Sequence, residues 1–377
     1  MRWPDGIGSG AVPCGIKDGD LDLGALVADH PVVWTGTFTR NAAAAAPVVW
    51  SRSLLGAKAR AIVVNSGNAN ACTGSKGREA VEATARATAS ALGCDPREVL
   101  IASTGPIGIY LPVTKVVDSI PRLVPTISTD ATEFSRAILT TDTSPKTAQA
   151  VAGKSTIMGV AKGAAMIAPN MATMLAFLAT DAALPQIELD RHLRRAVSRT
   201  FDRISVDACE STNDSVFLLS TGTRAVDPAA FGSALEDVCK DLAEQIVGDA
   251  EGAARMMRIQ VEGADTEESA VTLGKAVAAS ALWRAAVNGG DPNWGRVVSA
   301  LGSVHRGMDL SKLEISVGPE VVFRNGEPCG SLDVARKAME EPEFSLLCVV
   351  GDGAGAAEML SADLSEAYVA LNAEGST

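Results

Sequence analysis

The sequence predicts a mixed α/β protein with two lobes. Short apolar runs of β-forming residues, such as Ala61–Asn65 and Ser215–Ser220, alternate along the chain with helix-forming segments such as Arg78–Leu92. The 377 residues are too many for one ordinary domain and can bury two cores. The strict strand–helix rhythm and the Gly-rich fingerprint of a dinucleotide-binding fold are both missing from the sequence.

Further elements follow from the same patterns. Strands are expected at apolar runs that end in turn residues, namely Val99–Ala102, Thr173–Thr180, Arg258–Glu262, Leu313–Val317 and Phe344–Val350. Helices are expected at Ile187–Phe201, Asp227–Ile246, Glu268–Val287 and Gly355–Leu371. Ser144–Val160 lacks a clear period and is expected to be a long loop. A change of composition near Thr266 places the lobes at about residues 1–270 and 271–377.

Composition excludes several classes of function. Hydrophobic residues make up 47% and charged residues 21%, as in soluble globular proteins. The net charge of −12 and the lack of a dense Lys/Arg run argue against a nucleic-acid partner. The apolar stretches are too short for a membrane span, and the first residues lack an apolar signal core. Seven scattered cysteines without a CxxC pair favour reduced thiols in the cytoplasm and no metal site.

The three histidines do not suggest a catalytic pair. His30, His192 and His305 occur in unrelated contexts, and His192 belongs to a polar helical stretch, where a surface position is expected. A nucleophile in this chain therefore needs a base other than histidine.

The segment Lys162–Asp181 offers such a base. It is a loop with Gly and Pro that ends in Ala172-Thr173 at the start of an apolar strand. A Thr hydroxyl needs a neighbouring base to act as a nucleophile. Cleavage of the Ala172–Thr173 bond would give Thr173 a free α-amine with a pKa of about 8, so that one residue supplies both groups. Taken alone, the segment fits an ordinary buried strand better, because β-branched residues are common there.

The rest of the chain favours the nucleophile. Lys162-Gly163, Met166-Ile167, Pro169 and Met171–Leu175 resemble the self-processing motif of the ornithine acetyltransferases (glutamate N-acetyltransferases) of arginine biosynthesis. Further blocks match that family in the same order: Asn65–Gly74, Ser103–Gly105, Thr140–Thr143, Ser211–Asp214, Glu251–Ala253 and Asp291–Arg296. The resemblance extends from near residue 7 to the C-terminus.

The resemblance implies a fold, a processing event and a reaction. The fold is a layered αββα arrangement of the N-terminal-nucleophile type with a smaller C-terminal α/β lobe. The chain cuts itself into an α chain (1–172) and a β chain (173–377), which assemble as an α2β2 heterotetramer. Thr173 takes the acetyl group of N-acetylornithine as an ester and passes it to glutamate in a ping-pong mechanism. No cofactor is required, and acetyl-CoA as a second donor stays an open question.

The resemblance also assigns roles to single residues. Thr104 and Gly105 match the oxyanion hole, which a hydroxyl and a backbone N–H would form. Lys162 matches a position that contacts the substrate α-carboxylate, and Glu251 one that receives the ornithine ammonium. Further substrate-binding positions are matched by Thr140, Thr173, Asn372 and Thr377.

Some positions depart from the family pattern. Ala208–Glu210 stands in place of a Gly-Asp-Thr-like stretch, and Met359–Ala362 in place of a Trp-Gly-Cys-like patch. These differences leave two other enzymes open. One is a paralogue of specialised metabolism that moves an acyl group between other amino acids, and the other is a self-processed amidohydrolase or aminopeptidase. An uncleaved binding protein, in which Thr173 is inert, is the non-enzymatic alternative.

Overall fold

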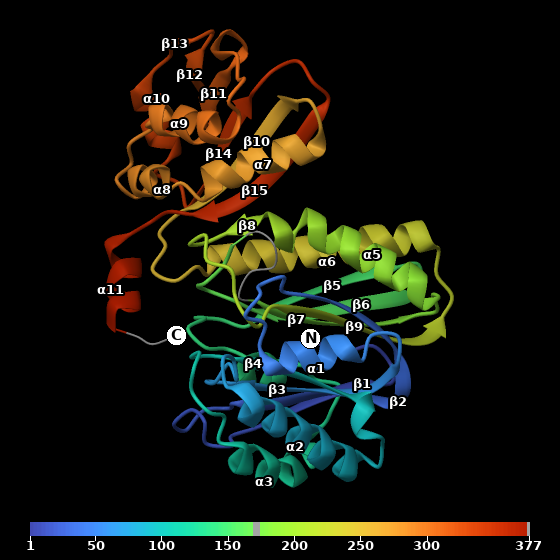
Figure 1. Cartoon of the computed structure of the whole chain (residues 1–377). Coiled ribbons are helices and arrows are strands. Elements are labelled where there is room, and N and C mark those ends of the chain that lie inside the picture. Colours follow the sequence, from blue (N-terminus) through green and yellow to red (C-terminus); the bar gives the residue numbers. More distant parts are fainter. Residues whose placement is uncertain (169–173, 375–377) are drawn as a thin grey trace.

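The computed structural model of the chain has two lobes, each built around its own sheet (Figure 1). It describes residues 1–168 and 174–374. The first sheet has the strand order β4-β3-β2-β9-β7-β6-β5, with β1 paired to β2. Its strands are β1 (Ile7–Val12), β2 (Leu23–Phe38), β3 (Lys58–Ser66), β4 (Val99–Thr104), β5 (Lys146–Ala152), β6 (Ser155–Lys162), β7 (Leu175–Ala182) and β9 (Ser215–Arg224).

Strand β2 divides the first sheet into two layers. It pairs with β1 and β3 through its first half and with β9 through its second half. Its register with β3 shifts between Val27 and Val32, where Pro31 lacks the N–H that a regular ladder needs. The β1–β4 part therefore faces the β5–β9 part across an apolar core (Figure 1).

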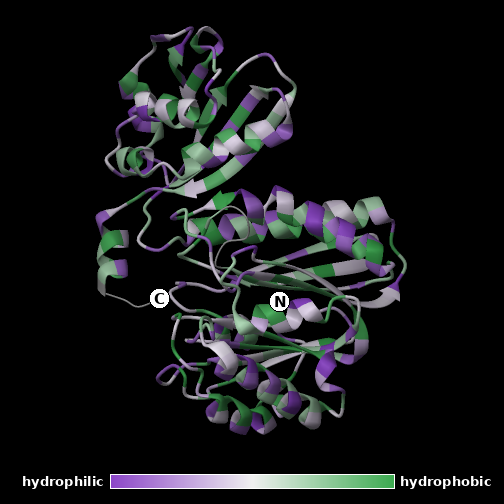
Figure 2. Cartoon of the chain, in the orientation of Figure 1, coloured by the Kyte–Doolittle hydropathy of each residue, from purple (hydrophilic) through white to green (hydrophobic). Residues whose placement is uncertain are grey.

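Helices cover both outer faces of these two layers. Helices α5 (Gln186–Arg199) and α6 (Pro228–Gly248) pack on the β5–β9 layer, and α2 (Gly74–Leu92) and α3 (Val113–Leu123) on the other. The shorter helices of this lobe are α1 (Ala46–Ser53) and α4 (Thr132–Ala137). Figure 2 shows hydrophobic and hydrophilic residues alternating along α5, as expected for a helix with one buried face. The predicted mixed α/β fold with an αββα lobe is confirmed.

The second lobe is smaller. Its sheet has the order β13-β12-β11-β14-β10-β15-β8. The strands are β8 (Ile204–Ser205), β10 (Met256–Ala264), β11 (Glu314–Val317), β12 (Glu320–Arg324), β13 (Glu327–Pro328), β14 (Glu343–Val349) and β15 (Gly355–Ala362). The helices are α7 (Glu267–Ala278), α8 (Ala281–Asn288), α9 (Trp294–Val304), α10 (Leu332–Ala338) and α11 (Glu366–Glu374). Because β10 already belongs to this sheet, the change of lobe precedes Met256 rather than falling at the expected 270/271.

Three expected elements differ from the structure. The expected loop Ser144–Val160 is wrong: it contains β5 and most of β6, whose Ala- and Gln-containing sequence hides the alternation of a strand. The expected helix Glu268–Val287 is two helices, because the Ser280 side chain caps a new helix by accepting the Trp283 N–H. The expected helix Gly355–Leu371 is strand β15 followed by α11.

His192 does not lie at the surface as expected. Its side chain is 8% exposed and packs edge-on against Phe231 of α6, with ring centroids 5.8 Å apart. The ring occupies the space beside Gly232, where a Cβ would approach His192 Nδ1 to 2.4 Å. Burial lowers the pKa of His192, as does the neighbouring Arg191 charge. The histidine thus fills the contact between α5 and α6.

Among the described residues, none of the helices is by itself long and apolar enough to cross a membrane. Helices α7 and α8 reach such a length and composition only together, across a bend of 57°.

Candidate active site

A cavity of about 230 Å³ lies at one edge of the first lobe, where strands of both layers end. On one layer, the paired positions Lys162, Leu175, Ser215 and Phe38 form a row across β6, β7, β9 and β2. On the other layer, β4 ends at Thr104. The cavity is lined by Lys17, Gly67, Ala69, Thr104, Gly105, Pro106, Ile107, Thr140, Thr141, Lys162, Ala165, Met166, Ser211, Thr212 and Asn213. The structure therefore brings together four of the residues expected from the sequence, Thr104, Gly105, Thr140 and Lys162.

Three of the other expected residues, Ala172, Thr173 and Thr377, lie outside the described residues. The nearest described neighbour of Thr173 in the chain is Met174, whose N–H donates to Asp214 Oδ1 over 3.1 Å. Asp214 is completely buried, and this burial raises the pKa of its carboxyl well above the usual range. A buried acid thus fixes the backbone one residue beyond the expected nucleophile.

Thr104 and Gly105 form a turn that only glycine permits. Gly105 has φ +138°, and a Cβ at this residue would lie 2.4 Å from the backbone nitrogen of Asn68. The Asn68 N–H donates to the Thr104 carbonyl over 3.0 Å, which closes the turn. The Thr104 hydroxyl lines the cavity and makes no hydrogen bond with the described residues. A hydroxyl and a glycine backbone at the same cavity wall suit an oxyanion hole.

Asn213 holds this turn in place, a role that the sequence did not suggest. Its side-chain amide donates to the carbonyls of Ala69 (2.7 Å) and Ser103 (2.8 Å). Ser103 in turn donates to Asn65 over 2.6 Å. In the sequence, the block Ser211–Asp214 stood out only as a match to the family. In the structure, this block connects the two layers of the first lobe at the cavity.

Lys162 is a buried cation at the cavity. Its Nζ donates to the Thr140 hydroxyl over 2.7 Å and lies 3.6 Å from Asp142 Oδ2. Asp142 also accepts hydrogen bonds from Lys146 Nζ (2.8 Å) and from the Gly163 N–H (2.6 Å). Burial opposes ionisation of Asp142, but the charges of Lys162 and Lys146 outweigh it and hold the pKa of this carboxyl well below its usual range. Lys146 also pairs with Asp249 over 2.5 Å, so that Lys162 has only the longer contact to Asp142 and can pair with a substrate carboxylate.

Glu251 and Asn372 contact each other beside the cavity rather than lining it. Asn372 of α11 donates to Glu251 Oε2 over 2.8 Å. The Glu251 N–H donates to the Ala164 carbonyl over 2.9 Å, next to Ala165 of the cavity lining. Helix α11 thereby links the second lobe to the cavity edge of the first.

Asp207, which the sequence did not single out, strengthens this link. It accepts the N–H groups of Met166 (2.5 Å) and Ile167 (2.9 Å) and the hydroxyl of Tyr368 of α11 (3.2 Å). Met166 needs this support because its φ is +54°, a region that non-glycine residues rarely adopt. The loop that precedes the predicted cleavage site is therefore held from both lobes.

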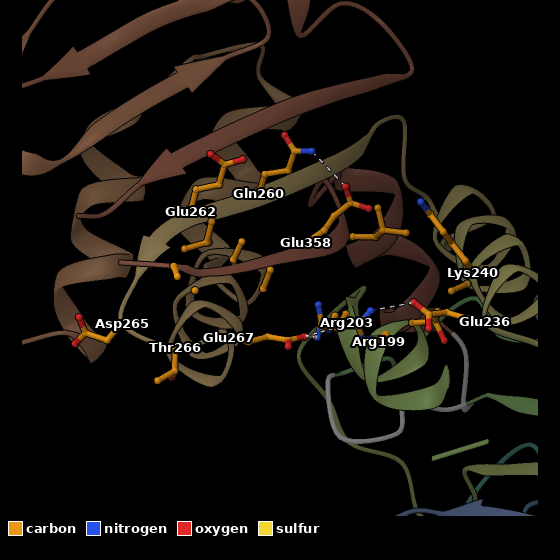
Figure 3. A pocket seen from close by; sticks show the side chains of 18 residues that line it. Arg199, Arg203, Glu236, Lys240, Gln260, Glu262, Asp265, Thr266, Glu267 and Glu358 are labelled. Carbon is orange, nitrogen blue, oxygen red and sulfur yellow. Dashed lines mark hydrogen bonds and ion pairs between the residues drawn. The ribbon is translucent and has the colours of Figure 1, made fainter. Parts of the chain in front are cut away.

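A larger cavity, about 680 Å³, lies between the lobes and not at this site. Figure 3 shows its charged residues, which come from α5 and the short 3-10 turn after it (Phe201–Arg203), from α6, β10 and β15, and from the start of α7 with the residues just before it. Arg203 pairs with Glu267 over 2.5 Å, and Arg199 with Glu236 over 3.4 Å. No residue expected from the sequence to act in catalysis lines this interlobe cavity. The described residues contain no cluster of side chains that could hold a metal ion.

A sequence profile of the ArgJ family matches residues 9–377. The chain belongs to the ArgJ family. A relative named arginine biosynthesis bifunctional protein ArgJ, from Thermus thermophilus, is 43% identical over 377 residues, which cover 99% of this chain and 98% of the relative. A protein of the same name from Streptomyces avermitilis is 40% identical, and the match covers 97% of each chain. The family predicted from the sequence is thus confirmed.

A solved structure agrees with this assignment. The crystal structure of the arginine biosynthesis bifunctional protein from Bacillus halodurans is 32% identical and superposes with a TM-score of 0.50. The superposition covers 52% of this chain and 96% of the solved chain. That solved polypeptide is therefore about half as long as this ArgJ-family chain.

Ala208 occupies a backbone conformation that favours glycine. Its φ is +60°, and the family pattern has glycine at this position. Left-handed backbone costs a non-glycine residue about 1–2 kcal/mol, whereas glycine loses somewhat more entropy on folding. We expect Ala208→Gly to raise the free energy of unfolding by up to about 1 kcal/mol in urea titrations.

A matched control is Ala87→Gly within α2, where the same change should lower stability by about 1 kcal/mol. Equal destabilisation by both substitutions would contradict the strain at Ala208.

The buried Asp142 predicts a pH-dependent contribution to stability. Asp142→Asn leaves Lys162 without a carboxylate and Lys146 with Asp249 alone, and we expect a loss of about 3–5 kcal/mol at pH 7. Because the folded-state pKa is depressed, this contribution is complete above the unfolded pKa of about 4 and is lost as pH falls through the folded pKa.

The measurement compares urea unfolding of the variant and the wild type from pH 7 down to pH 3. The difference should shrink below about pH 4, while Asp118→Asn on the exposed face of α3 should have little effect. A difference that does not change with pH would contradict the assigned charge state.

Proposed function

We propose that this acyltransferase moves an acetyl group from N-acetylornithine to glutamate through an ester on Thr173. The observation that carries the proposal is the cavity itself. It combines a hydroxyl and a glycine turn at Thr104-Gly105 with the buried cation Lys162, and β7 begins at the same edge, two residues beyond Thr173. Membership of the ArgJ family supports the same reaction.

The first half-reaction forms the ester. The Thr173 Oγ attacks the acetyl carbon, and the α-amine of Thr173 accepts the hydroxyl proton. Negative charge develops on the acetyl oxygen, where the Thr104 hydroxyl and the Gly105 N–H would donate; the loss of one such donor typically costs about 10²–10³ in rate. The C–N bond then breaks, and ornithine leaves with the proton on its amine. In the second half-reaction the glutamate amine attacks the ester, which restores the Thr173 hydroxyl.

Substrate recognition follows from the charges at the site. Both substrates carry an α-carboxylate, for which Lys162 is the buried partner. The substrates differ at the side chain, where ornithine has an ammonium group and glutamate a carboxylate. Glu251, held by Asn372, would favour the ornithine ammonium. Thr140 and the C-terminal residues Asn372 and Thr377 complete the proposed binding positions.

Self-cleavage before Thr173 is part of the proposal, because only a free α-amine provides the base. The half-length chain of the solved Bacillus halodurans relative supports a family of cleaved chains. The α (1–172) and β (173–377) chains would stay together, as an α2β2 assembly in the cytoplasm. No cofactor is needed for the steps above, and acetyl-CoA is proposed only as a possible second acetyl donor.

Cleavage and acylation can be tested together. Intact-mass analysis of the purified protein should give two fragments that meet at Ala172/Thr173, and Thr173→Ala should stay whole and inactive. Incubation with N-acetylornithine alone should add one acetyl mass to the fragment that begins at Thr173. Thr104→Ala should still bind substrate but turn over about 10²–10³ more slowly.

An active, uncut wild-type chain would refute the processing step. Acetyl release to water at the same rate with and without glutamate would instead indicate a hydrolase. Transfer of an acyl group between other amino acids, but not from N-acetylornithine, would indicate the specialised paralogue.

The role of Glu251 predicts a change of specificity. A charge-assisted contact contributes about 1.5–3 kcal/mol, so Glu251→Gln should lower kcat/KM for N-acetylornithine about ten- to a hundredfold. The effect on glutamate in the second half-reaction should be smaller, whereas Lys162→Met should impair both substrates. The comparison is made with Glu79→Gln, an exposed acid of α2 that should behave as the wild type. An equal loss for both substrates in Glu251→Gln would assign this residue a structural role with Asn372.

A further inference from the structure

A second hollow, separate from the catalytic cavity, is lined by arginines. This arginine groove has a volume of about 520 Å³ and lies between the end of β2, α1 and α5. Its lining residues are Gly36, Thr37, Phe38, Arg40, Arg52, Leu55, Arg194, Arg195, Val197, Ser198 and Asp202. Four guanidinium groups and one carboxylate face one groove in a protein whose net charge is −12.

Two of these arginines lack a carboxylate partner in the described part of the chain. Arg194 pairs with Asp190 over 2.8 Å and Arg195 with Glu236 over 3.7 Å, but no ion pair involves Arg40 or Arg52. Arg52 donates to the Thr39 carbonyl over 2.6 Å, and its guanidinium lies 5.8 Å from the centre of the Phe38 ring. Asp202 is a carboxylate in the same lining, but neither Arg40 nor Arg52 forms an ion pair with it or with any other described carboxylate.

Thr37 is a further polar residue in the lining of the groove. The Thr37 hydroxyl is buried and has no hydrogen-bond partner among the described residues. A buried hydroxyl without a partner is costly, and an anion oxygen would satisfy it. Arg40 and Arg52 line the same groove as Thr37, and Arg52 already donates one hydrogen bond, to the Thr39 carbonyl.

The interlobe cavity of Figure 3 differs from the arginine groove in its charge balance. Its arginines, Arg199 and Arg203, already pair with Glu236 and Glu267. Further carboxylates, those of Glu262, Asp265 and Glu358, line the same cavity. An anion would be repelled there, although the interlobe cavity is the larger of the two.

We propose that the arginine groove binds a polyphosphate anion, either a free diphosphate or a nucleotide that carries one. Guanidinium forks match phosphate oxygens in bidentate geometry, and a diphosphate has enough charge to engage Arg40 and Arg52 together. The groove falls within the range of about 300–1,000 Å³ that is typical of small-molecule sites.

The groove is connected to the cavity of the proposed active site through Thr39. Thr39, between the groove residues Phe38 and Arg40, donates its N–H to the Asp214 carbonyl over 2.9 Å and its hydroxyl to the Ser211 carbonyl over 2.7 Å. Ser211 lines the catalytic cavity. A ligand bound to Arg40 and Arg52 would therefore contact the same segment whose Thr39 holds Ser211 at the cavity.

Titration calorimetry of the full-length purified protein tests the proposal, in phosphate-free buffer at constant ionic strength. Inorganic pyrophosphate should bind the wild type saturably, and Arg40→Gln should weaken binding about tenfold or more. Arg40 makes no hydrogen bond with the described residues, so this variant should fold as the wild type does. The double variant Arg40→Gln/Arg52→Gln should abolish binding. The matched control, Arg86→Gln on α2, removes one exposed arginine outside the groove and should bind normally.

A parallel titration with ADP distinguishes the two sources of the diphosphate. Tighter binding of ADP than of pyrophosphate would identify a nucleotide ligand, and equal or weaker binding a free polyphosphate. Absence of saturable binding for both probes would overturn the proposal, as would equal weakening by Arg40→Gln and Arg86→Gln. The measurement contains no amino-acid substrate, so its outcome is independent of the proposed acetyl transfer.

Discussion

Strand β2 pairs with different neighbours along its sixteen residues, and the two-layer arrangement of the first lobe depends on this change of partners. Its first half belongs to one layer and its second half to the other, with the interruption of the β3 ladder at Pro31 between them. Because the strand continues through this point, the two layers face each other and their ends meet at one edge. The end of β4, which supplies Thr104, is thus brought opposite the end of β6, which supplies Lys162.

Buried polar groups then give this edge its chemistry. Lys162 and Lys146 share Asp142, and the loop ahead of residue 169 is fixed by Asp207. A buried charge is tolerated only with good partners, which explains why so many carboxylates here accept backbone N–H groups. The second lobe contributes through α11, whose Tyr368 and Asn372 contact residues of the first lobe. The cavity edge of the first lobe therefore has partners in both lobes.

The sequence was sufficient for the mixed α/β fold class, whereas the four cavity residues Thr104, Gly105, Thr140 and Lys162 were expected from the resemblance to the family. Strands such as β3 and β9 have continuous apolar runs, and Thr104, Gly105, Thr140 and Lys162 lie within short motifs. By contrast, β5 has small or polar residues at its positions and resembles a loop.

The supporting carboxylates could not be predicted in the same way. Asp142, Asp207 and Asp214 act on backbone groups of other segments, and only the folded chain brings these partners together. Composition likewise gave no sign of the arginine groove, since arginines distant in sequence converge in an otherwise acidic protein. The position of Glu251 beside the cavity, rather than in its lining, is also a property of the tertiary structure.

The strand order has a consequence for a chain cut before Thr173. Strands β7 and β9 would belong to the newly formed C-terminal piece, yet they lie between β2 on one side and β6 on the other, both from the N-terminal piece. Separation would require the simultaneous rupture of two hydrogen-bonded ladders inside a covered sheet. Strands of the two polypeptides would thus be interleaved in one sheet. The pieces could be exchanged between molecules only if this sheet unfolded.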